Sequence, residues 1–180
     1  MTEELEMTNR MDIFCTECGA VCKKEGMAII DDQNICSSCL YGDVSPVQIY
    51  PIGFVCNQLD RDDTDSGLSG RTQTSRIELF PAQKRFMYRM EEEREITIVY
   101  YLHKSRSVRS TFKRGFDGKK VGVFASRTPD RLSKIGIQDV RLVKVEGTTL
   151  TVEGMDAIDG TPVLDIKMKW AGRGSSKLGF

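Results

Sequence analysis

Two Cys-x-x-Cys pairs, Cys15 with Cys18 and Cys36 with Cys39, constrain the fold of this 180-residue chain more than any other feature of its sequence. The pairs are separated by 17 residues, and four thiolates at such a spacing can surround one tetrahedral ion, as in structural zinc ribbons. Nearby Cys22 is a possible substitute ligand, but its spacing from Cys18 fits a metal knuckle less well. We therefore predict a structural Zn²⁺ site made by Cys15, Cys18, Cys36 and Cys39. The ion would stabilise a ribbon over residues 1–43, a segment too short to fold alone.

Two other uses of these cysteines fit the sequence less well. The only histidine, His103, lies far along the chain, which excludes a Cys/His finger. Disulfides are the competing interpretation, but the acidic N-terminus MTEELEMTNR does not have the pattern of a secretory signal, and disulfides are rare in the cytosol. No run approaches the roughly 18 apolar residues of a membrane span. We expect a cytoplasmic protein that does not enter a membrane.

The charge of the chain is unevenly distributed although the formal net charge is zero. Residues 1–65 contain 13 acidic and 4 basic residues, whereas residues 103–144 contain 12 basic and 3 acidic residues. These two regions either neutralise each other within or between subunits, or the basic region forms a surface for phosphate groups. The sequence alone leaves both interpretations open.

Beyond the ribbon, short β-branched and aromatic runs alternate with turn-forming residues. PAQKRFMYRMEEE (81–93) carries Phe86, Met87 and Met90 at helical spacing, so it is predicted to be a helix packed on the core. The predicted strands are residues 47–55, 75–80, 96–103, 119–127, 135–147, 148–155 and 161–170, with a long loop at 57–74. This content predicts a mainly β fold, a small antiparallel or mixed β-barrel with one or two helices. The barrel domain would span residues 44–170, followed by a flexible tail at 171–180.

No P-loop, GxGxxG fingerprint, GxSxG elbow or HExxH motif is present, so the sequence does not resemble a hydrolase. Polar residues instead follow several predicted strands, namely His103 and Lys104, Ser126 and Arg127, and the turn that holds Asp156 and Asp159. Strand ends of a barrel meet at a rim, where ligands bind when side chains fill the interior. We expect these residues to form a site for a ligand with both an amine and a carboxylate.

The segment GVFASRTPDRLSKIGIQDVRLVKVEGTTLTVEGMDAIDGTPVLDIK (122–167) closely resembles the TsaA-like, or TrmO-like, β-barrel methyltransferases. That family reads GVFATRSPxRPNPIG, then a strand pair, then LDxxDGTPVLDIKPY. PIGFV (51–55), SRIELFP (75–81) and ITIVYYLHK (96–104) also fit, so the resemblance covers residues 47–170. It implies a small barrel, a homodimer, that binds S-adenosyl-L-methionine and methylates threonylcarbamoyladenosine beside the anticodon of tRNA.

The resemblance also implies roles for particular residues. The cofactor pocket would be formed by His103, Lys104, Arg127, Ile137, Asp156, Ala157, Ile158, Asp159 and Gly160. His103 is also the candidate catalytic residue, by elimination, and Asp165 is expected to be structural. RNA would contact the basic residues Lys113, Arg114, Lys119, Lys120, Arg131 and Lys134.

The sequence departs from the family pattern in two places. RLSKIG (131–136) replaces RPNPIG, so the loop loses its prolines and gains a cation at Lys134. Met168, Lys169 and Trp170 follow DIK in place of Pro-Tyr. Two alternatives to the tRNA methyltransferase therefore remain open. One is a methyltransferase of the same fold with another acceptor, such as a protein side chain, and the other is a non-enzymatic module that docks RNA or protein.

Overall fold

The computed structural model describes residues 13–59, 73–105, 108–115 and 117–169. The predicted tail (171–180) and most of the predicted loop (57–74) lie outside the described residues. The chain forms two compact units. The ribbon unit comprises Met1–Val47 with Arg106–Leu132, and the barrel unit comprises Gln48–Ser105 with Ser133–Phe180. The region predicted as one barrel domain (44–170) therefore contributes residues to both units.

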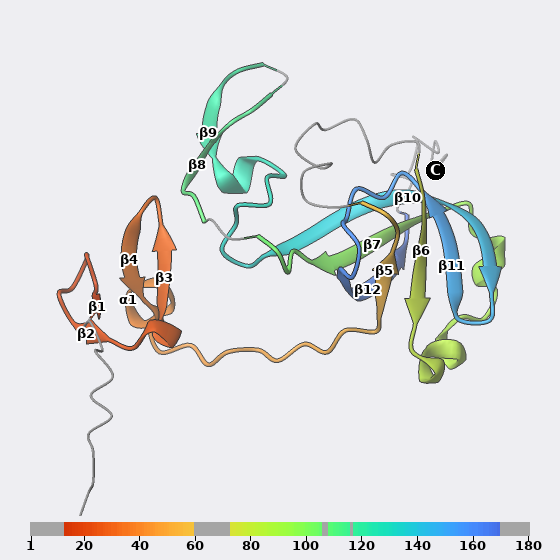
Figure 1. The fold of residues 1–180 in the computed structure, drawn as a ribbon, viewed down its shortest axis with the longest axis horizontal. Coiled ribbons are helices and arrows are strands. Elements are labelled where there is room, and N and C mark those ends of the chain that lie inside the picture. Colours follow the sequence, from red (N-terminus) through yellow and green to blue (C-terminus); the bar gives the residue numbers. More distant parts are fainter. Residues whose placement is uncertain (1–12, 60–72, 106–107, 116, 170–180) are drawn as a thin grey trace, which may run out of the picture. The chain divides into compact units, whose positions relative to one another are not determined.

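Six antiparallel strands of the barrel unit form a closed barrel in the order β10-β11-β6-β5-β12-β7 (Figure 1). Closure leaves no strand edge of this sheet unpaired. Along the chain the strands are β5 (Gly53–Cys56), β6 (Thr74–Leu79), β7 (Glu95–Tyr101), β10 (Ile135–Glu146), β11 (Thr149–Glu153) and β12 (Pro162–Met168). The mainly β fold with a small barrel is thus confirmed.

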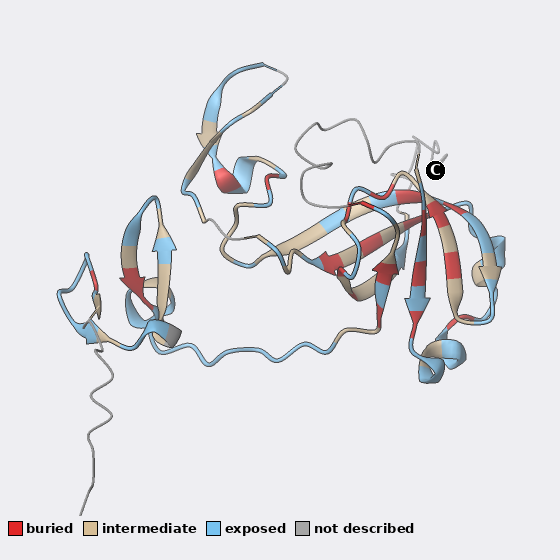
Figure 2. Cartoon of the chain, in the orientation of Figure 1, coloured by how far each residue is buried: buried red, intermediate tan, exposed pale blue. Residues whose placement is uncertain are grey.

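The core lies inside the barrel, where alternate residues of β6 and β7 are buried (Figure 2). In β6, exposed residues alternate with buried Ser75, Ile77 and Leu79, and in β7 the buried residues are Ile96, Ile98 and Tyr100. The side chains with no exposed surface are Val55, Ile77, Ile96, Ile98, Leu150, Val152, Met155 and Val163. Each contributes about 1.5–3 kcal/mol of transfer free energy when fully buried.

The strand registers bring six strand ends together at one rim of the barrel. Cys56 pairs with Arg76 in the β5–β6 ladder, Thr74 with Glu153 in β6–β11, and Ile135 with Tyr101 in β10–β7. The ends of β5, β7 and β11 therefore meet the starts of β6, β10 and β12. We call this end the ligand rim, because it carries His103 and the turn at residues 156–160.

The described N-terminal part of the ribbon unit contains two small hairpins, a 3₁₀ turn and a short α-helix. The elements are β1 (Ile13–Phe14), β2 (Val21–Cys22), η1 (Lys24–Gly26), β3 (Met27–Ile30), β4 (Gln33–Cys36) and α1 (Ser37–Tyr41). The same unit includes the basic segment, which we define as residues 108–115 and 117–131. Its elements are the hairpin of β8 (Thr111–Lys113) and β9 (Lys120–Gly122), followed by η4 (Val123–Ala125).

Two elements predicted from the sequence are wrong in detail. The predicted helix at 81–93 is instead two 3₁₀ turns, η2 (Pro81–Phe86) and η3 (Met90–Glu92). They are separated because Arg89 adopts a left-handed backbone with φ of 60°, which an α-helix cannot contain. Met87 is buried as expected, but Phe86 is 75% exposed, so the predicted apolar stripe does not form.

The predicted strand at 119–127 is also wrong, because only Lys120–Gly122 is extended and it pairs with β8 rather than with a barrel strand. Residues Val123–Ala125 form a 3₁₀ turn in place of the rest of that strand. Among the described residues, no helix is both long enough and apolar enough to span a bilayer.

Candidate functional site

The turn that holds Asp156 and Asp159 is fixed to the ligand rim mainly by backbone hydrogen bonds. The Asp159 N–H donates to the Leu59 carbonyl (3.0 Å), and the Gly160 N–H donates to the Val55 carbonyl (2.8 Å). Gly160 has a φ of 71°, a conformation that glycine adopts without strain. Ala157 and Met155 are buried beneath the turn. The apolar residues of this segment therefore anchor the turn in the barrel and leave its aspartates at the surface.

The three aspartates of this region each have a structural contact. The Tyr100 hydroxyl donates to Asp156 Oδ1 (3.2 Å), and Asp156 N–H donates to Gln138 Oε1 (3.1 Å). Asp159 Oδ1 accepts the Asn57 N–H (3.0 Å). Asp165 Oδ1 accepts the Ile166 N–H (2.8 Å), as suits the structural role expected of it. Hydrogen bonds from backbone N–H groups and from the Tyr100 hydroxyl thus account in large part for the three aspartates in this otherwise apolar stretch.

Asn57 connects three parts of the ligand rim. Its side-chain Nδ2 donates to Ser75 Oγ (3.0 Å) at the start of β6 and to the Ala157 carbonyl (2.9 Å) in the turn. Its Oδ1 accepts the N–H of Leu59 (3.0 Å). Ser75 is only 1% exposed, so its hydroxyl depends on protein partners for hydrogen bonding.

Replacing Asn57 by alanine is expected to lower the free energy of unfolding of the barrel by about 2 kcal/mol, because three side-chain hydrogen bonds are lost. Chemical denaturation of the variant would measure the loss. Gln58→Ala is the matched control, since Gln58 is exposed at the next position. Equal stability of the two variants would contradict the role given to Asn57.

A cavity of about 520 Å³ opens at the same rim. Its volume falls within the range of about 300–1,000 Å³ that is usual for small-molecule sites. The residues that line it are Cys56, Asn57, Gln58, Gln73, Thr74, Arg76 and Asp159. Asp159 Oδ2 has no partner among the described residues, and the Arg76 guanidinium lies 3.1 Å from the Glu78 carboxylate on the exposed face of β6. The lining therefore offers both a carboxylate and a guanidinium to a bound molecule.

His103 lies at the ligand rim just after β7, and its Nδ1 is 3.4 Å from the Thr161 hydroxyl. Burial lowers the pKa of His103 below its ordinary value, and the nearby Lys104 ammonium lowers it further. The ring is therefore neutral at pH 7 and able to accept a proton. Of the other predicted rim residues, Lys104 is exposed and Ile137 is 54% exposed on β10.

The two arginines predicted for the cofactor and the RNA, Arg127 and Arg131, belong to the ribbon unit and differ in their contacts. Arg131 Nε donates to the Thr128 carbonyl (3.0 Å), and its Nη2 donates to the Ser126 carbonyl (2.7 Å). Arg131 therefore holds the loop at residues 126–131 in shape. Arg127 is exposed and has no hydrogen bond or ion pair with another described residue. It is available to an anionic ligand.

Lys134 occupies a backbone conformation that the family pattern does not allow. It has a φ of 52°, and its carbonyl accepts the Leu102 N–H (2.8 Å) at the ligand rim. Proline, which the family carries at this position, is fixed near a φ of about −65°. The loop before β10 thus follows a path in this chain that RPNPIG could not adopt.

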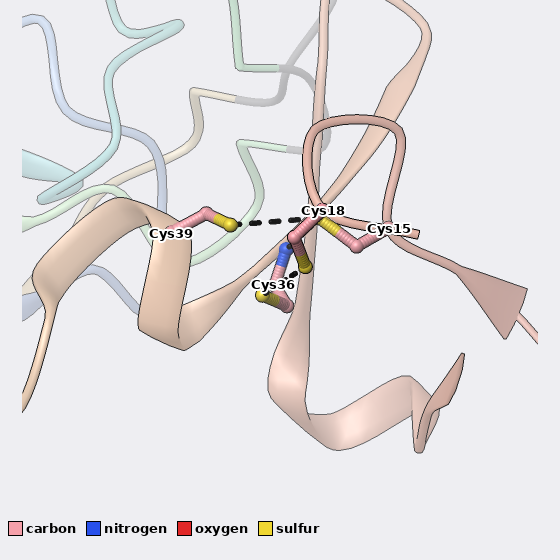
Figure 3. Close-up of side chains that lie close together, drawn as sticks. All are labelled: Cys15, Cys18, Cys36 and Cys39. Carbon is pink, nitrogen blue, oxygen red and sulfur yellow. Dashed lines mark hydrogen bonds between the residues drawn. The ribbon is translucent and has the colours of Figure 1, made fainter. Parts of the chain in front are cut away.

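The four predicted metal ligands lie close together in the ribbon unit (Figure 3). All four Sγ atoms are within 4.8 Å of one another, and Cys15 to Cys39 and Cys18 to Cys36 both measure 3.8 Å. Thiolates around one Zn²⁺ at about 2.3 Å from the ion also stand about 3.8 Å apart. A disulfide would need about 2.05 Å, so paired oxidation does not explain the arrangement. The residues fit a tetrahedral ion.

Backbone N–H groups favour the thiolate form of one of these ligands, Cys15. The Cys36 N–H donates to Cys15 Sγ (3.4 Å), and backbone N–H groups at Cys18 and Cys36 lower the pKa of the Cys15 thiol to about 6. A thiol of this kind is a thiolate at neutral pH, the form that binds metal. Cys22 lies outside the four-cysteine group, and burial raises the pKa of its thiol.

Comparison with known proteins decides the family. The family model described as "tRNA-methyltransferase O N-terminal domain" matches residues 64–171, which include five of the six barrel strands and the DGTP turn. The chain belongs to the TrmO family. The resemblance to TrmO-like proteins inferred from the sequence is thereby confirmed.

Several relatives match over the barrel region. An S-adenosyl-L-methionine-binding protein of Archaeoglobus fulgidus is 31% identical over 119 residues, which cover 65% of this chain and 85% of that protein. The mouse tRNA (adenine(37)-N6)-methyltransferase is 41% identical over 81 residues, covering 43% of this chain and 19% of the mouse protein. A Pyrococcus abyssi relative is matched over 50% of its length. The chain thus spans half or less of some of its TrmO-family relatives.

Solved TrmO structures share the fold. A crystal structure of TrmO matches with a TM-score of 0.58 and 26% identity, covering 73% of this chain and 62% of that one. TrmO from Pseudomonas aeruginosa matches with a TM-score of 0.56 and 26% identity over 70% of this chain and 57% of that one.

The sequence did not single out most residues of the rim cavity. Of the seven that line it, only Asp159 was predicted as a cofactor contact. Asn57 and Gln73 border a polar stretch without periodicity, so neither could be placed at the rim before the ladders were known. The exposed, polar start of β6 was the one available signal, since Thr74 and Arg76 alternate there with buried residues.

Proposed function

We propose that this protein is an S-adenosyl-L-methionine-dependent methyltransferase that acts on the adenosine next to the tRNA anticodon, in its threonylcarbamoyl-modified form. The observation that carries the proposal is the overlap of two features. The family match covers five of the six strands that make the ligand rim, and a polar cavity of suitable volume opens at that rim. The mouse relative is named for the same adenine position.

The cavity suits S-adenosyl-L-methionine, which has an amine, a carboxylate and a nucleoside. Asp159 can accept from the amine or a ribose hydroxyl, and Arg76 can donate to the carboxylate. The side-chain amides of Asn57, Gln58 and Gln73 can form hydrogen bonds that fix the orientation of the remaining parts of the cofactor. When bound, this cofactor supplies an electrophilic methyl group. The protein then has mainly to orient the acceptor in line with it and to exclude competing nucleophiles.

The acceptor nitrogen is amide-like and a weak nucleophile, so a nearby base would assist its deprotonation. Neutral His103 at the ligand rim can accept that proton. The tRNA itself would be bound through phosphate contacts with the exposed lysines of the basic segment. A cytoplasmic location and a homodimer complete this proposal, and light scattering at micromolar concentration would test the dimer.

We also propose that Cys15, Cys18, Cys36 and Cys39 hold one structural Zn²⁺. The sulfur separations support this assignment. With four protein ligands, no coordination position is left for a substrate, so the ion would stabilise the ribbon and take no part in methyl transfer.

The first test is calorimetric titration of the zinc-loaded protein with S-adenosyl-L-methionine, with binding expected at about one molecule per chain. Arg76→Ala should weaken binding roughly tenfold, because one charge-assisted contact is lost. Arg141→Ala is the matched control, since Arg141, like Arg76, makes an exposed ion pair on the barrel, with Glu153, but does not line the cavity. Arg127→Ala tests the role that the family resemblance gives to Arg127.

Transfer of a labelled methyl group to tRNA then separates the acceptors. Label in threonylcarbamoylated tRNA, and not in unmodified tRNA, is the expected result. Cofactor binding with label only in protein would favour a protein acceptor. The absence of cofactor binding, with bulk tRNA present, would reject the methyltransferase and favour a docking module.

A further inference from the structure

The ribbon hairpin β3–β4 holds the basic segment through its turn residue Asp31. Ile30 forms a parallel backbone bridge with Val108, and the Asp31 N–H donates to the Val108 carbonyl (3.2 Å). The Asp31 carboxylate accepts the Ser110 N–H at both oxygens, at 3.1 and 3.3 Å. Asp31 thus binds both Val108 and Ser110, although these residues lie nearly 80 positions away in the sequence.

Asp31 occupies the first of the two central positions of the β3–β4 turn. Ile30 and Gln33 pair in the β3–β4 ladder, and the residues between them, Asp31 and Asp32, have φ of 48° and 63°. Such two-residue turns favour asparagine, aspartate or glycine, because both positions need a left-handed backbone. Both aspartates suit the turn, but it is the carboxylate of Asp31 that also accepts the Ser110 N–H. Asp32 is exposed and has no hydrogen bond or ion pair with another described residue.

Ser110 joins this contact to the rest of the basic segment. Its carbonyl accepts the Val123 N–H (2.9 Å), and the adjacent Arg109 N–H donates to the Asp130 carbonyl (3.1 Å). Ser110 and its neighbour Arg109 thus connect η4 and the loop at 126–131 to the strand that the ribbon hairpin holds. Arg131 holds that loop, which carries the exposed Arg127.

The basic segment has features of a phosphate-binding surface. Lys113 and Lys120 stand directly opposite each other in the β8–β9 hairpin, an arrangement of like charges that destabilises a ladder. Lys113 and Lys119 have no ion-pair partner among the described residues, whereas Asp117 and Asp130 are paired with Arg114 and Arg109. Phe124, at 88% exposure, offers a ring on which an unpaired base can stack. A segment that carries both such cations and an exposed aromatic suits a single-stranded RNA loop.

We propose that the four-cysteine ribbon positions the basic segment for RNA, with Asp31 as the positioning residue that joins the two. The metal would then influence RNA binding from a distance, because it folds the hairpin on which Asp31 lies. This inference rests on the proposed tRNA substrate for its RNA part, while the contact between hairpin and segment is independent of it.

The test compares Asp31→Gly with Asp32→Gly in the full-length, zinc-loaded protein. Glycine relieves the left-handed strain at either position, so both turns should form, and only Asp31→Gly loses the carboxylate on Ser110. The N–H of residue 31 remains in both variants. Its hydrogen-exchange protection therefore reports whether the β3–β4 hairpin still contacts the basic segment at Val108.

Asp31→Gly is expected to lower the protection factor of the residue-31 amide roughly tenfold and to weaken binding of an anticodon stem-loop RNA by about three- to tenfold. Asp32→Gly should leave both within about twofold of the unsubstituted protein. Equal protection in the two variants would overturn the inference. If the unsubstituted protein binds no RNA at low salt, the proposed tRNA substrate and the RNA part of this inference fall together, and the exchange data still decide the positioning contact.

Discussion

Stripping the metal, or replacing Cys36 by serine, is expected to unfold the N-terminal part of the ribbon unit while the barrel stays folded. Among the described residues, the buried cluster there consists of Cys15, Ile35 and Cys36, with Met27 and Ile30 among its half-buried neighbours. Strands β1 and β2 have two residues each. Segments below about 40 residues rarely bury enough surface to fold without a metal or disulfide. Binding of zinc by such a segment supplies about 10–16 kcal/mol at pH 7, most of its folding free energy.

Amide chemical-shift dispersion of residues 13–43, measured with and without a chelator, would show this loss. Elemental analysis should give about one zinc ion per chain before chelation and none after it. Cys22→Ser is the matched control, because Cys22 lies in the same unit and outside the four-cysteine group, so its replacement should retain the ion. A fully dispersed ribbon in metal-free protein would reject the site.

Replacing Gly53 by alanine is expected to destabilise the barrel by about 3 kcal/mol, the upper part of the usual range for overpacking. A Cβ at this position would lie 2.3 Å from the Glu78 carbonyl oxygen and 2.7 Å from the Leu79 Cα. Both atoms belong to the backbone of β6, which pairs with β5 at this point. The strands would have to separate to admit the methyl group, and the ladder would lose hydrogen bonds.

Urea denaturation followed by the far-UV signal would measure this change. Gly122→Ala is the control, because a Cβ there meets no atom within 4 Å and its φ is −62°. Gly136→Ala should be intermediate, because its Cβ would meet the Tyr100 ring, a side chain that can shift at the cost of its hydrogen bond to Asp156. An unchanged urea midpoint for Gly53→Ala would contradict the close approach of Gly53 to the β6 backbone.

Short-range patterns in the sequence were enough for the class of fold and the grouping of the four cysteines. The period-two burial of Ile77, Ile96 and Ile98 and the Cys-x-x-Cys spacing arise from local backbone geometry, which a single segment expresses by itself. The same patterns failed where a local conformation interrupted them. The left-handed Arg89 divides the predicted helix, and the hairpin partner of Lys120–Gly122 is three residues that carry no strand pattern of their own.

The assembly of the candidate site was decided by tertiary structure. The DGTP turn and His103 were recognisable in the sequence, but Asn57, Thr74 and Arg76 reach the same rim only through the ladders of a closed barrel. The attachment of the basic segment to the ribbon through Asp31 depends likewise on a contact across nearly 80 residues. Spacing and periodicity report on neighbours along the chain, whereas a cavity is made by residues that are distant in sequence and are brought together by strand register.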